Sequence, residues 1–375
     1  MACAGLYSLP PADVERITDW HHVLLLAAEE NAVIALRDHL RSQQWAHVPP
    51  AVQRHVAMLA LHRESQMSLL RNRLEESLTA LNAAGIETMM LKGSALAATV
   101  YPTFAARPMR DIDLLIKPQY AEEARAVLLD HGWTADPGLP GDDGYASHHH
   151  LPPLRDTAAS GLRLEIHRAL VPSGHPFRYS EVAIWNAATV ARCGTAHALV
   201  MHPTHHAAHI AIHFAWSHML KKGAWHAFRD LATLFRAQLL DWHELVRVAD
   251  EWGASSCCYW TLQLGAALSG LSVPGSVLQR LRPRWPEFLR RPLERHFATA
   301  ILRNDGACPS VRLDQALWAL AMLPRRDGHG SSRPWSVSED LQLARRETAS
   351  AATQTRRHTL QRMQHSARYI AELMA

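Results

Sequence analysis

Two aspartates near the middle of the chain have a spacing that suits a bound divalent cation. Asp111 and Asp113 lie in the segment RDIDLLIK, where the acids alternate with apolar residues as in a β-strand. Side chains two residues apart on a strand point to the same face, so both carboxylates share one side while Ile112 and Leu114 face a core. Like charges this close are costly to hold together unless a cation neutralises them, and such oxygen ligands suit Mg²⁺ or Mn²⁺. The segment therefore predicts a divalent metal site.

A third carboxylate is expected from a second strand. In LRLEIHR, at residues 162–168, apolar and polar residues alternate, and Glu165 belongs to the polar set. Three carboxylates on two strands are able to hold two ions, one that activates an attacking hydroxyl and one that binds a triphosphate. We therefore predict Asp111, Asp113 and Glu165 as the catalytic and metal-ligating residues of a phosphoryl or nucleotidyl transfer.

Small and basic residues upstream of the aspartates suit the phosphates of a nucleotide. In LKGSAL the glycine lacks a side chain, so a phosphate can approach backbone N–H groups at the start of a helix predicted over 94–100. The serine hydroxyl adds a donor, and a lysine and an arginine supply a point charge and a bidentate fork. The predicted nucleotide-binding residues are Lys92, Gly93, Ser94 and Arg107.

The order of these motifs resembles that of the polymerase-β-type nucleotidyltransferase superfamily: Gly93-Ser94, then Asp111-x-Asp113, then a single acid on a later strand. More narrowly, LKGSAL, Tyr101, RDIDLLI and LEIHR are similar to a family of uncharacterised bacterial nucleotidyltransferases with a helical segment on each side of the catalytic core. The similarity covers roughly residues 50–270. It implies that Asp111, Asp113 and Glu165 bind Mg²⁺ or Mn²⁺ and that Gly93 and Ser94 hold the phosphates of a nucleoside triphosphate.

The resemblance also indicates a reaction. The expected activity moves a nucleoside monophosphate, AMP from ATP, onto an acceptor hydroxyl with release of pyrophosphate. Relatives with a similar HHLPPL and LEIHR arrangement look like tailoring enzymes of peptide natural-product pathways, above all those of lasso peptides, which favours a peptide or small-molecule acceptor. Two alternatives stay open: a catalytically degenerate regulator that binds nucleotides, and a toxin-like transferase that modifies RNA or tRNA.

Histidines are unusually frequent, at 25 in the chain. His202, His206, His209 and His213 are spaced by four, three and four residues, which predicts one helix face. Without a cysteine or a second ligand motif, this stripe favours a polar lining or histidines bonded to backbone over a zinc site. The candidates for the acceptor side are His149, His167, His209 and Asp230, the last because it matches an aspartate of the family.

The elements around these motifs predict an α+β fold. Helical periodicity before Gly85 predicts an N-terminal helical region over 1–84. Short apolar runs then predict a small mixed β-sheet core over 85–190, with strands at 86–92, 111–117, 162–170 and within YASHHHLPPL, and with a helix that ends before Gly132. The helical period returns in a C-terminal domain over 191–324, followed over 325–375 by a linker and a helix that begins after Ser338.

Composition excludes several classes of protein. The 375 residues are 48% hydrophobic, which excludes a chain disordered throughout, and 39 basic against 35 acidic residues exclude a dedicated DNA-coating protein. No apolar run approaches the roughly 18 to 20 residues of a membrane helix, and no signal peptide is visible, so we expect a cytoplasmic protein without membrane contact. Five cysteines without C-x-x-C spacing favour reduced, mostly buried thiols.

Overall fold

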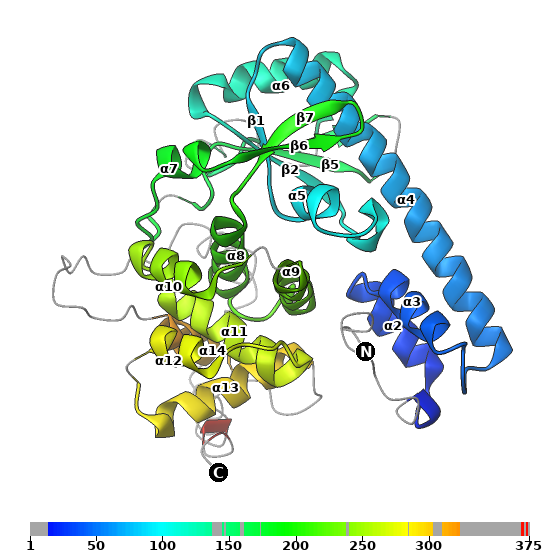
Figure 1. The fold of residues 1–375 in the computed structure, drawn as a ribbon, viewed down its shortest axis with the longest axis vertical. Helices are drawn as coiled ribbons and strands as arrows, with labels where there is room; N and C mark the ends of the chain where they lie inside the picture. Colours follow the sequence, from blue (N-terminus) through cyan, green and yellow to red (C-terminus); the bar gives the residue numbers. More distant parts are fainter. Residues whose placement is uncertain are drawn as a thin grey trace, which may run out of the picture. The chain divides into compact units, whose positions relative to one another are not determined.

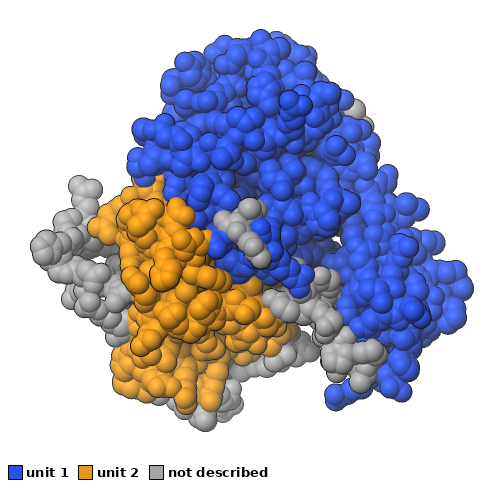
Figure 2. Space-filling view, viewed as in Figure 1, with its two compact units in different colours: residues 1–171, 180–207, 229–240 blue, residues 172–179, 208–228, 241–375 orange. Residues whose placement is uncertain are grey.

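The computed structural model describes residues 14–136, 145, 148–157, 161–172, 174–237, 240–283, 285–302, 310–322, 369–370 and 373. The chain forms two compact units, which Figure 2 shows in different colours. The first comprises residues 1–171, 180–207 and 229–240, and the second comprises residues 172–179, 208–228 and 241–375. The boundary falls inside two helices, α8 (Pro203–Ile212) and α9 (Ala224–Arg236), so each of them contributes to both units.

A seven-stranded mixed sheet forms the core of the first unit (Figure 1). Its strands are β1 (Thr88–Met90), β2 (Asp111–Ile116), β3 (Trp133–Ala135), β4 (Leu154–Asp156), β5 (Arg163–His167), β6 (Thr189–Cys193) and β7 (Ala196–Val200). Their order is β3-β4-β5-β2-β1-β7-β6. The β2–β5 and β1–β7 pairs are parallel and the other pairs are antiparallel. The predicted α+β class, a mixed sheet flanked by helices, is confirmed.

The helices of the first unit precede the sheet or connect its strands. They are α2 (Trp20–Glu29), α3 (Val33–Ser42), α4 (Pro50–Ala83), α5 (Lys92–Thr99), α6 (Ala121–Asp130) and α7 (Glu181–Asn186), with short 3-10 turns η1 (Phe104–Ala106) and η2 (Pro118–Tyr120). Two predicted helix ends are confirmed, because Gly85 follows α4 with φ of +71° and Gly132 follows α6 with φ of +82°. Both values lie in the left-handed region, which glycine adopts at little cost.

The long helix α4 joins two hydrophobic clusters. In its C-terminal half, fully buried side chains three or four residues apart form one face and pack with the sheet: Met67, Leu70, Leu74, Leu78 and Leu81. Nearer its start, Val56 and Ala60 belong instead to a cluster with residues of α2 and α3. The periodicity that predicted this helix is therefore the periodicity of its buried face.

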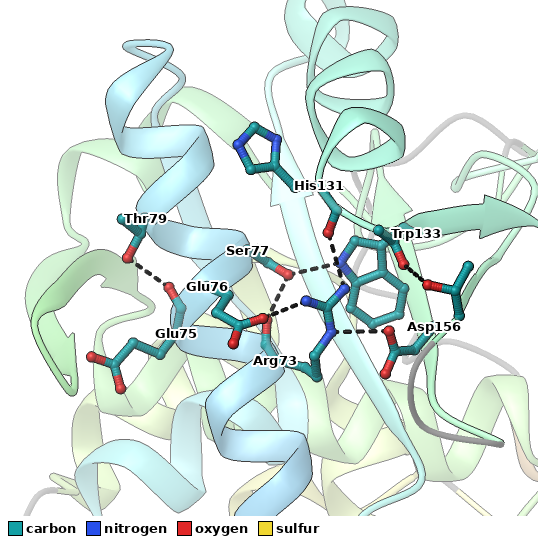
Figure 3. Close-up of polar contacts among 10 residues, drawn as sticks. Arg73, Glu75, Glu76, Ser77, Thr79, His131, Trp133 and Asp156 are labelled. Carbon is teal, nitrogen blue, oxygen red and sulfur yellow. Dashed lines mark hydrogen bonds and ion pairs between the residues drawn. The ribbon is translucent and has the colours of Figure 1, made fainter.

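Polar contacts of Arg73 attach α4 to the edge of the sheet (Figure 3). The Arg73 guanidinium pairs with the fully buried carboxylate of Asp156 in β4 at 3.0 Å and lies 4.9 Å from the centre of the Trp133 ring in β3. Trp133 Nε1 in turn donates to Ser77 Oγ at 2.9 Å. A buried carboxylate that loses its cation typically costs about 3–5 kcal/mol, so Arg73 stabilises this junction.

The sheet continues past residue 190, where the sequence predicts the end of the core. The hairpin of β6 and β7 turns at Gly194, and β7 pairs in parallel with β1. Glu75 of α4 accepts the Thr195 N–H at 2.7 Å, and a Cβ at residue 194 would collide with that carboxylate. The φ of +61° favours glycine at this turn, and a side chain there would also have to displace the Glu75 carboxylate.

Helices are the regular secondary structure in the described part of the second unit. They are α10 (Trp242–Glu251), α11 (Ser255–Ser269), α12 (Gly275–Leu281), α13 (Glu287–Leu302) and α14 (Val311–Ala321), and a π-helical turn, η4 (His213–Ser217), follows α8. Two of its tryptophans link helices: Trp260 Nε1 donates to Ala321 O at 3.0 Å and Trp318 Nε1 donates to Ala215 O at 2.7 Å. Buried indoles are satisfied here by backbone carbonyls.

Several sequence predictions concern residues that the structure does not describe. The linker at 325–334 and the start of the helix after Ser338 lie outside the described residues, and the division into four domains stays a prediction. Three of the cysteines, Cys193, Cys257 and Cys258, are buried and have free thiols. Among the described helices, none combines the length and apolar character needed to span a membrane.

Candidate functional site

The strand register brings two of the predicted carboxylates together. Asp113 of β2 lies opposite Glu165 of β5 in the parallel pair, and Leu115 lies opposite His167. Residues in register on parallel strands present their side chains on the same face. The intervening residues Ile112 and Leu164 are fully buried in the core on the other face. The face predicted for Glu165 therefore agrees with the register, while its catalytic role stays a prediction.

The imidazole of His167 lies between these two carboxylates. His167 Nε2 is 2.8 Å from Asp113 Oδ1 and 3.5 Å from Glu165 Oε2, and the ring is 1% exposed. One donor atom from each of the three residues lies within 4.8 Å of the other two. Two donors about 2.1 Å from one ion and at right angles to each other are about 3 Å apart, so this set fits a single divalent ion.

Lys92 supplies a second positive group to the same oxygen. Its Nζ lies 2.9 Å from Asp113 Oδ1, and the backbone N–H of Leu91 donates to Asp113 O at 3.0 Å. Lys92 has φ of +47°, a left-handed conformation that is uncommon for a residue with a side chain. The turn between β1 and α5 is therefore held against Asp113 through both backbone and side chain.

The charges of the site shift its pKa values in different directions. Burial opposes ionisation of Asp113, but Lys92 and His167 outweigh it and hold the pKa of Asp113 far below its usual range. In the same way burial disfavours the charged form of His167, yet its bonds to Asp113 and Glu165 raise the pKa of the ring. Burial raises and the bond to His167 lowers the pKa of Glu165, and the net effect is a lowered value. Carboxylates and imidazolium thus stabilise each other.

Asp111 differs from the other two acids. It stands at the start of β2 with its side chain in contact with solvent. Neighbouring protein atoms partly remove water from the Asp111 carboxyl, and this desolvation is the larger cause of its raised pKa. Together with the negative charge of Asp113, it raises the pKa of Asp111 to about 6. A third negative charge on this face is therefore unfavourable until a cation compensates it, which is the behaviour expected of a metal ligand.

The first turn of α5 carries the predicted phosphate-binding residues. Backbone N–H groups in the first turn of a helix have no partner within the helix, and the bond of Ala95 N to Leu91 O at 3.3 Å is the first of this type in α5. The hydroxyl of Ser94 is buried and faces Met109 Sδ at 3.6 Å. Serine therefore offers its backbone rather than its side chain to a ligand in this conformation.

Arg107 has a protein partner instead of an open guanidinium. Its Nε and Nη2 donate to the two oxygens of Asp230 at 2.7 and 2.8 Å, and Tyr101 Oη donates to Asp230 Oδ1 at 2.7 Å. Arg107 and Asp230 are 8% and 3% exposed. A Cβ at Gly93 would lie 3.5 Å from Arg107 Cζ, an ordinary van der Waals distance, so Arg107 packs directly against the first turn of α5.

The acceptor-side candidates occupy different places. His149 lies beside the carboxylates, with its ring centre 5.3 Å from that of His167, and burial lowers the pKa of His149 to about 2. His209 is buried in the second unit with its ring centre 6.3 Å from that of His213. Both oxygens of Asp230 are engaged as described above, so Asp230 acts here as a partner of Arg107. Acceptor contact stays a prediction for all four residues.

Sequence reasoning did not foresee two features of the site. The position of His167 between the acids follows from the same alternation that located Glu165, because residues 165 and 167 share a strand face. The Arg107–Asp230 pair joins residues 123 positions apart, and no local pattern reveals such a contact.

Comparison with protein families places this arrangement in context. A family model described as an uncharacterised nucleotidyltransferase matches residues 17–270, which include the whole sheet and every candidate residue named above. Comparison with curated proteins and with solved structures gives no match.

Proposed function

Because the chain belongs to the family of uncharacterised nucleotidyltransferases, we propose that it transfers a nucleoside monophosphate, AMP from ATP, onto an acceptor hydroxyl and releases pyrophosphate. One observation carries the proposal: Asp113 and Glu165 stand in register on adjacent strands, beside the first turn of α5. Their donor atoms and that of His167 fit one divalent ion, and Asp111 on the same face extends the set of oxygens.

Metal ions complete such a site. Mg²⁺ or Mn²⁺ held by Asp111, Asp113 and Glu165 would neutralise charge on the triphosphate and on the oxygens that attack and leave. The raised pKa of Asp111 supports this role, because its charge is disfavoured in the protein by itself. The donor set of three carboxylates next to an imidazole is chemically suited to either ion.

Backbone and basic groups bind the triphosphate in this proposal. The N–H groups of Gly93 and Ser94 point out of the first turn of α5, where the helix dipole favours an anion. Lys92 lies at the same turn, with its Nζ on Asp113 Oδ1, and would exchange that carboxylate for a phosphate oxygen. Arg107 supports the turn from behind through its pair with Asp230 rather than binding phosphate itself.

The bonds change in one displacement. The acceptor oxygen forms a bond to the α-phosphorus while the bond from that phosphorus to the β-phosphate oxygen breaks, and pyrophosphate leaves with the electron pair. The acceptor hydroxyl would be deprotonated near Glu165, whose lowered pKa keeps the carboxylate ionised and able to accept the hydrogen bond of that hydroxyl near pH 7, and the proton would pass to water.

The identity of the acceptor rests on the resemblance alone. A peptide or small-molecule hydroxyl is proposed first because of the likeness to peptide-tailoring enzymes. RNA and a regulatory role without turnover are outcomes that the same experiment distinguishes.

The test is a transfer assay in which a cell extract supplies every candidate acceptor at once. The full chain is incubated with each of the four α-³²P-labelled nucleoside triphosphates, Mg²⁺ or Mn²⁺ and the extract, and labelled products are fractionated before and after protease or RNase treatment. The variant Glu165→Gln is the matched negative. The variant Glu87→Gln is the control, because Glu87 is exposed and pairs with Lys117 away from the site.

We expect label from ATP on a protease-sensitive or small product with the wild type and with Glu87→Gln, and none with Glu165→Gln. Label lost after RNase treatment would identify RNA as the acceptor. Nucleotide binding without transfer in any fraction would contradict the proposed reaction and favour the regulator. Equal transfer by Glu165→Gln would remove Glu165 from the catalytic set.

A further inference from the structure

The imidazole of His167 points toward the two carboxylates of the candidate metal site. Its ring is 1% exposed, and the polar contacts of the ring are made through Nε2, to Asp113 Oδ1 at 2.8 Å and to Glu165 Oε2 at 3.5 Å. The other nitrogen, Nδ1, has no hydrogen-bond partner within the described part of the chain. A buried imidazole with this orientation directs one nitrogen at the space between two carboxylates.

That space has the dimensions of a coordination sphere. Ligands of a six-coordinate ion at about 2.1 Å are about 3 Å apart when adjacent, and the two distances from Nε2 lie on either side of this value. All three donor atoms lie within 4.8 Å of one another. Within the described residues this is the one group of three such side chains that meets the distance requirement for a metal.

A nitrogen donor changes which ions such a site prefers. Carboxylate oxygens alone suit Mg²⁺, whereas imidazole favours first-row transition metals, and affinity rises from Mn²⁺ through Fe²⁺ to Co²⁺ at mixed nitrogen and oxygen sites. We propose that His167 Nε2 is a direct ligand of the divalent ion together with Asp113 and Glu165, so that the site binds Mn²⁺ or Co²⁺ in preference to Mg²⁺. This inference deepens the proposed function and rests on it for the presence of a metal.

Lys92 adds a consequence to this arrangement. Its Nζ and His167 Nε2 both contact Asp113 Oδ1, so an ion bound at that oxygen displaces the ammonium and requires a bare Nε2. Binding at that oxygen therefore frees Lys92 for the triphosphate. Without a metal ion, Lys92 and His167 compensate the negative charge of the carboxylates and hold them in position.

The direct test uses the full chain loaded with Mn²⁺ alone. Pulsed electron paramagnetic resonance detects hyperfine coupling between bound Mn²⁺ and a ¹⁴N nucleus that ligates it. We expect this coupling in the wild type, its persistence in His150→Gln and its loss in His167→Gln. His150 is the matched control, because its ring centre lies 5.5 Å from that of His167 while its Nδ1 is bonded to Leu151 O.

Metal affinities measured by calorimetry separate ligation from mere positioning. A lost nitrogen ligand in His167→Gln should weaken Co²⁺ and Mn²⁺ binding by about tenfold or more while Mg²⁺ binding changes much less. His167→Asp, which restores an oxygen donor, should bind Mg²⁺ and should not recover the preference for Co²⁺. Thermal unfolding of each variant without metal shows whether it is folded.

Three results would overturn the inference: no ¹⁴N coupling in Mn²⁺-loaded wild type, coupling that persists in folded His167→Gln, or an equal loss of Mg²⁺ and Co²⁺ affinity. The wild-type spectrum needs no variant, so an absence of coupling there overturns the inference even if the variants do not fold. Nucleotide transfer without ¹⁴N coupling would sink this inference and leave the proposed function intact. Hyperfine coupling without any nucleotide transfer would support this inference and contradict the proposed function.

Discussion

Replacing Asp230 with asparagine tests the buried contact behind the first turn of α5. Asp230 accepts three hydrogen bonds, two from Arg107 at 2.7 and 2.8 Å and one from Tyr101 at 2.7 Å. Asparagine keeps the shape but presents an N–H₂ group where an oxygen stood, and it leaves the guanidinium without a counter-charge at 8% exposure. Removing one partner of a buried ion pair typically costs about 3–5 kcal/mol. We expect the free energy of unfolding to fall by about this amount, out of a total near 5–15 kcal/mol for a typical domain.

Urea unfolding monitored by circular dichroism measures the change in the free energy of unfolding, with Glu87→Gln as the matched control. That variant breaks the pair of Glu87 with Lys117, whose side chains are 52% and 38% exposed. Exposed pairs of this kind contribute less than about 1 kcal/mol. A loss for Asp230→Asn no larger than that of the control would refute the reasoning. A double variant with Arg107→Met should lose much less than the sum of the two single changes, because the two residues act as one unit.

Three further predictions concern the carboxylates and the turn. Mn²⁺ at about 100 times its Kd should raise the free energy of unfolding by about 2.7 kcal/mol, and Asp113→Asn should abolish this gain, whereas a surviving gain would place the ion elsewhere. The folded protein keeps the Asp111 proton up to about pH 6, while the unfolded chain releases it near 3.8. Ionisation of Asp111 therefore lowers the free energy of unfolding of the wild type as pH rises through this window. In denaturation curves, the stability of Asp111→Asn relative to the wild type should increase between about pH 4 and 6, and a stability difference that stays constant over this range would contradict the prediction. In Gly93→Ala the added methyl lies 3.3 Å from Met109 Sδ, and the helix propensity of alanine offsets this crowding to within about 1 kcal/mol. The KM for the nucleotide should nevertheless rise in steady-state assays, and an unchanged KM would argue against phosphate binding at this turn.

Local patterns were sufficient for the part of the site that lies on single strands. The alternation in RDIDLLIK and LEIHR assigned Asp113 and Glu165 to one face of the sheet and Ile112 to the core on the other face, and the strand register agrees. Alternation depends only on the two-residue period of a strand, so it is legible in sequence. The same alternation places His167 on the strand face of Glu165, although the sequence analysis proposed His167 for the acceptor side.

Contacts between distant segments could not be predicted. The pairing of Arg107 with Asp230, 123 residues later, was not foreseen. Nor was the contact of the Ser94 hydroxyl with Met109, and the phosphate-binding roles of both residues stay predictions. In both cases tertiary packing decides where the polar atoms point, and a lone arginine or serine motif does not encode its partner.

The β6–β7 hairpin was missed for a different reason. Its residues, TVARCGTAHALV, are small and weakly apolar, and its turn depends on Gly194 and on a carboxylate from α4. The pairing of β7 with β1 then places this hairpin in the sheet that carries the site. Such a strand is stabilised by its neighbours more than by its own propensity.

The most direct test of the central claim is to locate the bound ions. Crystals of the full chain grown with Mn²⁺ and a non-hydrolysable ATP analogue can be measured for anomalous scattering from manganese. The account predicts an anomalous peak within ligand distance, about 2.2 Å, of Asp113 and Glu165, with the triphosphate over the first turn of α5. Manganese and nucleotide bound elsewhere, with these carboxylates still paired to Lys92 and His167, would contradict it.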